Sequence, residues 1–73
     1  MSRVEITAWR PKCNKVEHTK LIKNRTGLDL AEAKKITDAV LEGRKPILEL
    51  PSEAGAKELI RELDAIGFEA RLI

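Results

Sequence analysis

Two predicted helices are separated by only three residues, and this spacing constrains the fold more than any other feature of the 73-residue chain. Gly27 ends the first helix, over about residues 15–25, because glycine accepts the left-handed backbone conformation that a helix end commonly needs. Asp29 begins the second helix, and Glu32 follows three positions later, as in a capping box. A connection this short favours a tightly packed helical hairpin.

Three short segments have the patterns of strands. Apolar and polar side chains alternate in residues 3–9, which predicts a half-buried strand. A brief apolar run lies between Pro46 and Pro51, and its length is typical of a strand rather than of a helix. Residues 68–73 alternate once more and are predicted to form the last strand.

A third helix is predicted to begin at Ser52 and to end at Gly67. The resulting order, strand-helix-helix-strand-helix-strand, predicts a two-layer α+β fold in which residues 1–73 form a single domain. We expect a three-stranded antiparallel sheet with the three helices on one face. Because the last strand-helix-strand unit needs a right-handed crossover, the first strand is expected to fill the gap at the centre of the sheet.

The apolar positions in these elements predict a thin core. A chain of this length buries only about 60% of the surface that its unfolded form exposes. Periodicity predicts the following buried residues: Ile6, Ile22, Leu30, Ala33, Ile36, Val40, Leu48, Leu59, Ile60, Leu63 and Leu72.

Few residues in the chain are suited to catalysis. Cys13 is the single cysteine, which excludes an internal disulfide and a multi-cysteine zinc site. His18 is the single histidine, and we interpret it as a surface or packing residue, because catalysis needs partners within hydrogen-bond reach. No phosphate-binding loop, nucleophile elbow or metal-binding signature is present. We therefore expect no enzymatic activity, no metal and no cofactor.

Positive charge is concentrated in one stretch of the chain. The whole chain has 14 Lys and Arg against 12 Asp and Glu, a net charge of +2, but Arg10 to Arg25 contains six basic residues and one acidic residue, a net charge of +5. Such a cluster attracts acidic partners. Aromatic residues make up only 3% of the chain, too few for a base-stacking platform, so an acidic protein surface is favoured over nucleic acid.

The chain shows no targeting or membrane segment. No apolar run approaches the roughly 20 residues that span a bilayer. Residues 1–7 lack the apolar stretch of a signal peptide. We expect a cytoplasmic protein.

One pattern of residues extends over both helices of the hairpin. It comprises Asn14-Lys15-Val16, Lys20, Lys23, Thr26-Gly27-Leu28, Leu30 and Glu32-Ala33-Lys34. This pattern resembles the C-terminal globular domain of the bacterial ribosomal stalk protein seven/twelve, and the resemblance extends from Val4 to Leu72. It implies the same order of strands and helices.

In that family the domain is the mobile tip of the ribosomal stalk and captures the translational GTPases. The resemblance therefore implies a non-catalytic protein-binding domain that acts in translation, with elongation factors Tu and G as partners. It also implies these partner-binding residues: Lys15, Val16, Lys20, Lys23, Glu32 and Lys34.

The chain departs from the family pattern in two respects. Glu17, His18 and Thr19 stand where the family has small and apolar residues, and we expect these polar groups to weaken an apolar docking contact near Val16. The chain also lacks the family's dimerisation bundle and hinge, so we expect a monomer that does not attach to the stalk base in the family way. The alternative is a stand-alone adaptor of the ClpS-like fold that binds a different acidic protein.

Overall fold

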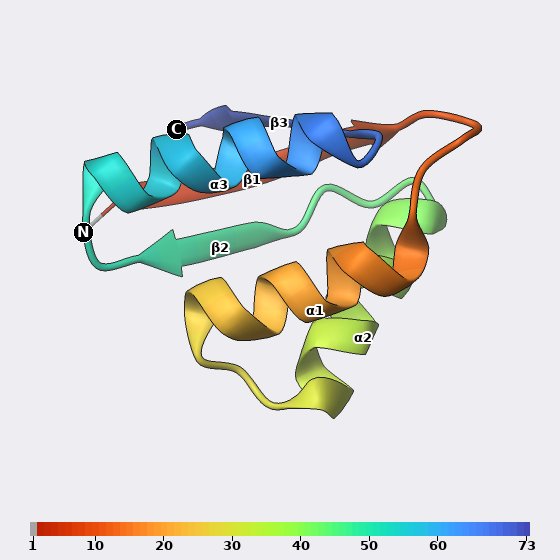
Figure 1. Ribbon diagram of the computed structural model, residues 1–73, viewed down its shortest axis with the longest axis horizontal. Helices are drawn as coiled ribbons and strands as arrows, with labels where there is room; N and C mark the ends of the chain where they lie inside the picture. The colour runs from red at the N-terminus through yellow and green to blue at the C-terminus, as the bar shows by residue number, and fades with distance from the viewer. Residues whose placement is uncertain (1) are drawn as a thin grey trace.

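The computed structural model describes residues 2–73. Figure 1 shows the elements in chain order: β1 (Ser2–Trp9), α1 (Lys15–Thr26), α2 (Leu30–Leu41), β2 (Ile47–Leu50), α3 (Glu53–Ala65) and β3 (Phe68–Leu72). The predicted order and the predicted α+β class are confirmed. No helix in residues 2–73 has both the length and the apolar character needed to cross a membrane.

The sheet is three-stranded and antiparallel, in the order β2-β1-β3, so the first strand is central as predicted. Val4 lies opposite Leu48 on one side, and Ile6 lies opposite Ala70 on the other. A β-bulge interrupts the second pairing between Ile6 and Ala8. The helices cover one face of the sheet, with α3 lying over β1 and with the α1–α2 hairpin on the side of β2 (Figure 1).

Local side-chain chemistry sets the start of each helix. The side chains of Asn14, Asp29 and Ser52 each accept a hydrogen bond from the backbone N–H three residues later. These bonds satisfy amides that lack a partner within the helix. Gly27 ends α1 with a φ of 77°, which confirms the predicted left-handed turn between the two helices.

The buried core agrees with the predicted periodicity at most positions. It contains Val4, Ile6, Ile22, Ala33, Val40, Leu48, Leu50, Ala56, Leu59, Leu63 and Phe68. The predictions for Leu30 and Leu72 are wrong, because these side chains are 59% and 37% exposed. Leu30 is the first residue of α2, and Leu72 is the last residue of an edge strand. Ile36 and Ile60 are half-buried.

A candidate partner-binding groove

A groove of about 390 Å³ lies between α1 and α2. Its lining residues are Lys15, Val16, Thr19 and Lys20 from α1, and Leu30, Lys34, Thr37, Asp38 and Leu41 from α2. Within each helix these positions recur at intervals of three or four residues, so they share one face. The short Gly27 turn places the two faces side by side.

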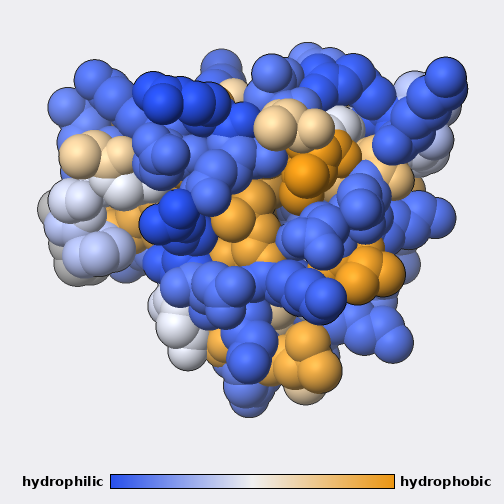
Figure 2. All heavy atoms as spheres, in the orientation of Figure 1, coloured by the Kyte–Doolittle hydropathy of each residue, from blue (hydrophilic) through white to orange (hydrophobic). Residues whose placement is uncertain are grey.

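Three aliphatic side chains, Val16, Leu30 and Leu41, line the groove. Val16 is 63% exposed and Leu30 is 59% exposed, although both are aliphatic. Figure 2 shows apolar side chains at the surface over the α1–α2 hairpin, set among hydrophilic ones. An exposed apolar surface with a polar rim is typical of a protein interaction site.

The rim of the groove carries three exposed lysines, Lys15, Lys20 and Lys34. Within residues 2–73 none of the three forms an ion pair. Asp38 is the single carboxylate among the lining residues. The groove therefore presents an excess of positive charge that the chain itself does not neutralise.

The structure brings together four of the six predicted site residues: Lys15, Val16, Lys20 and Lys34. Lys23 and Glu32 do not line the groove. Lys23 is exposed in the last turn of α1, and Glu32 forms an exposed ion pair with Lys35 at 3.5 Å.

Five groove residues were not predicted from the sequence: Thr19, Leu30, Thr37, Asp38 and Leu41. Their helical spacing relative to Val16 and Lys34 is the signal that identifies them. Leu30 was instead assigned to the core, because periodicity alone does not distinguish a buried stripe from an exposed one.

Beneath the groove, His18 and Thr37 join the two helices. The Nδ1 atom of His18 lies 2.6 Å from Thr37 Oγ1, which also lies 2.8 Å from Thr19 Oγ1. Thr37 Oγ1 also lies 3.2 Å from the carbonyl oxygen of Ala33, so its single hydroxyl proton serves one of these neighbours at a time. The Nε2 atom of His18 is buried and has no hydrogen-bond partner in the described part of the chain.

His18 is neutral at physiological pH. Its ring is fully buried and packs against Phe68, with 4.0 Å between the ring centroids. Burial lowers the pKa of His18 from 6.5 to about 4, because the charged imidazolium would lose its hydration. Of the two roles expected for this histidine, surface or packing, the structure shows packing.

Glu17 and His18, which were expected to weaken the docking contact near Val16, do not line the groove. His18 lies in the core, and Glu17 lines a separate hollow beside Leu21 and Glu62. Residue 17 therefore faces α3 while residues 16 and 20 face the groove, as the helical rotation requires. Only Thr19 of the three lies in the groove, and its hydroxyl donates to the carbonyl of Lys15 or contacts Thr37.

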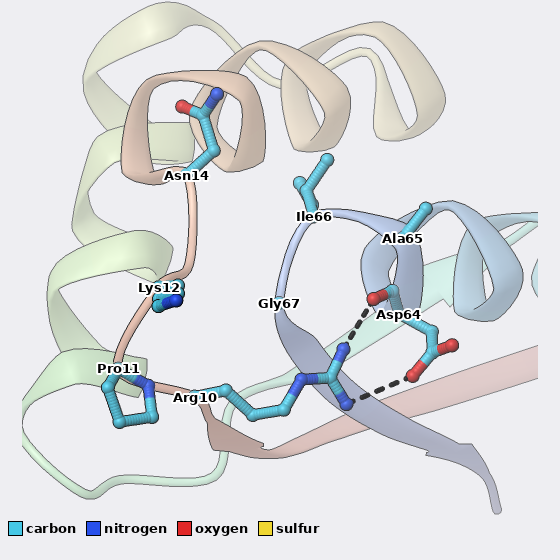
Figure 3. Close-up of a pocket in the computed structure, with 8 residues that line it drawn as sticks. All are labelled: Arg10, Pro11, Lys12, Asn14, Asp64, Ala65, Ile66 and Gly67. Atoms are coloured by element: carbon cyan, nitrogen blue, oxygen red, sulfur yellow. Dashed lines mark hydrogen bonds and ion pairs between the residues drawn. The ribbon is translucent and has the colours of Figure 1, made fainter.

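A larger hollow, of about 630 Å³, lies at the opposite end of α3 from Ser52 (Figure 3). Arg10 and Asp64 form an ion pair at its wall, with 3.1 Å between Nη1 and Oδ1, and Arg10 also donates to the Asp64 carbonyl (Figure 3). Asn14 is occupied in capping α1. These groups satisfy one another, so the hollow is a structural junction between the β1–α1 loop and the α3–β3 turn.

Residues 2–73 contain no group of three or more His, Cys, Asp or Glu side chains that could hold a metal ion. No protein-family model matches the chain. The chain is similar to the large ribosomal subunit protein bL12 of Rickettsia typhi, with 45% identity over 58 residues. The matched segment covers 80% of this chain and 44% of that protein, so the chain spans less than half of the relative's length.

Proposed function

Because the chain is a bL12 C-terminal-domain-like protein, we propose that it is a non-catalytic binding domain in translation and that it captures translational GTPases on the α1–α2 groove. The observation that carries this proposal is the exposed apolar surface of the groove beneath three lysines with no ion pair in residues 2–73. An acidic surface with an apolar centre is complementary to both features.

The lysines would act first, during encounter. Lys15, Lys20 and Lys34 need not break an ion pair within the described part of the chain before they meet a carboxylate. Lys23 lies outside the groove and would add only to the long-range attraction. Electrostatic steering of this kind raises association rates and weakens as salt is added.

The apolar side chains of the groove would act second, when the partner docks. Val16 and Leu30 are already exposed, so a partner that covers them removes apolar surface from water without unfolding the domain. Full burial of one aliphatic side chain contributes about 1.5–3 kcal/mol. Two such side chains in a small groove give a weak contact.

Titration of the labelled domain with elongation factors Tu and G, at low and at high salt, tests the proposal. We expect saturable binding at low salt, and we expect Lys20→Glu to weaken it by about tenfold or more, because Lys20 lines the groove. Lys57→Glu is the matched control, since it makes the same change in net charge on α3, away from the groove. Lys23→Glu should have an intermediate effect, mainly on the association rate.

Two results would count against this function. Absence of binding to either factor at low salt would reject factor capture and would favour an adaptor for a different acidic protein. Equal losses in Lys20→Glu and Lys57→Glu would show that net charge, and not the groove, governs the interaction.

A further inference from the structure

The two edges of the sheet differ in how well they are protected. The β2 edge has four residues and lies between Pro46 and Pro51, with Lys45 just before it. Short strands, proline and lysine are the usual means of preventing edge-to-edge pairing. The β3 edge has five residues, without proline or lysine and with one charge of each sign, Glu69 and Arg71, and no element of residues 2–73 pairs with its outer side.

The hydrogen bonds to β1 determine which peptide groups of β3 face outward. The N–H of Ile73 donates to the carbonyl of Arg3 at 3.0 Å, and the N–H of Arg10 donates to the carbonyl of Gly67 at 2.8 Å. Successive residues in a strand point their backbone N–H and C=O groups to opposite sides. The backbone groups of the odd-numbered residues in 67–73 therefore face β1. The peptide groups of residues 68, 70 and 72 therefore face away from the sheet.

This edge is complementary to itself. In an antiparallel pair centred on Ala70, the residue meets its own copy, and Phe68 lies opposite Leu72 of the second copy. Every outward-facing peptide group of β3 then has a partner. The same register places Glu69 opposite Arg71 of the second copy, at non-hydrogen-bonded positions where side chains approach most closely.

Both charged side chains are accessible for this pairing. Arg71 contacts Glu5 through Nε at 2.8 Å, which leaves its two terminal nitrogens free to donate. Glu69 is exposed, and its nearest basic group, Arg10, is 4.0 Å away. Two Glu69–Arg71 pairs would form across the symmetry axis.

We propose that two copies of this chain associate through their β3 edges and form one six-stranded antiparallel sheet. The interface would also cover part of Leu72 and Ile73, which are 37% and 51% exposed. The α1–α2 hairpin lies on the side of β2, at the other edge of the sheet, so both grooves stay open in the dimer (Figure 1). The interface is small, so the dimer is weak and concentration-dependent, in place of the monomer expected from the sequence.

Sedimentation velocity over a range of protein concentrations, up to about 1 mM, tests the proposal. We expect reversible dimerisation that Glu69→Lys weakens by about tenfold, because it places like charges opposite each other twice. Ala70→Pro should abolish the dimer, since it removes the outward N–H at the axis without removing a bond to β1. Glu49→Lys, on the β2 edge, is the matched control and should leave dimerisation unchanged.

Disulfide trapping then tests the register, with Cys13→Ser as the background. Chains carrying Glu69→Cys, mixed with chains carrying Arg71→Cys, should form a mixed disulfide faster than either chain alone, because this pair has the closest Cα atoms. A mixture of Ile47→Cys and Glu49→Cys, on the β2 edge, should not. A monomer at every concentration, a dimer unaffected by Glu69→Lys, or equal trapping on both edges would each overturn the proposal.

Discussion

The Nδ1 atom of His18 lies 2.6 Å from the Oγ1 atom of Thr37, and this buried contact joins α1 to α2 directly below the groove. Thr37 is shared between the core and the groove lining, so the packing of the hairpin and the shape of the binding surface depend on the same hydrogen bond. A change in the charge of His18 should therefore affect both.

The stability of the protein should depend on the ionisation of His18. Its pKa is about 4 in the folded state, against 6.5 without burial, so the unfolded chain binds the proton more readily. The free energy of unfolding should rise with pH from about 4 to 6.5, with a total contribution of up to about 3 kcal/mol, and should be unaffected by this group above that range. Urea unfolding at a series of pH values measures the dependence.

His18→Leu is the control for this titration, since His18 is the single histidine of the chain. The informative quantity is the difference between the two proteins, because it isolates the contribution of His18. Parallel stability curves between pH 5 and pH 7 would contradict the assignment of a buried neutral imidazole.

Gly67 should tolerate no side chain. It has a φ of 97°, and a Cβ atom there would lie 2.6 Å from the Cα atom of Cys13. Gly43 has a similar φ of 88°, but a Cβ atom there would meet open space, so Gly43→Ala carries the backbone strain alone. We expect Gly67→Ala to lose at least about 2 kcal/mol more stability than Gly43→Ala, as measured by thermal or urea unfolding. Equal losses would show that the contact with Cys13 relaxes easily.

Leu63→Ala should destabilise the fold by about 2–5 kcal/mol, because the Leu63 side chain is fully buried and its removal leaves a cavity. In a domain this small, that is a large part of the total stability. Denaturant unfolding measures the loss. A change below about 0.5 kcal/mol would mean that α3 does not pack against the sheet as described.

Leu30→Ala should change the affinity for the partner rather than the stability of the fold. Its side chain is 59% exposed, so the expected change in stability is below about 0.5 kcal/mol. Its loss from the groove floor should instead weaken factor binding by about three- to tenfold. Fluorescence titration of the folded variant gives the affinity, and a wild-type affinity would remove Leu30 from the docking surface.

Much of the architecture follows from local signals in the sequence. Asn14, Asp29 and Ser52 mark the helix starts and Gly27 marks the hairpin turn, because capping and left-handed backbone conformations depend on residues only a few positions apart. Alternation identified the first and last strands, and a short apolar run between two prolines identified the middle one, for the same reason. The positive charge of α1 was also evident, since charge needs no fold to be counted.

The tertiary structure decided which of these residues act together. Helical periodicity assigned Leu30 to the core, but the packing of α1 against α2 leaves it exposed in the groove. His18 was expected near the docking surface, and the rotation of α1 against Phe68 buries it. Lys34 and Lys23 look equivalent in the sequence, yet only Lys34 lines the groove. These outcomes depend on the relative rotation of helices and strands, which is set by contacts between residues far apart in the chain.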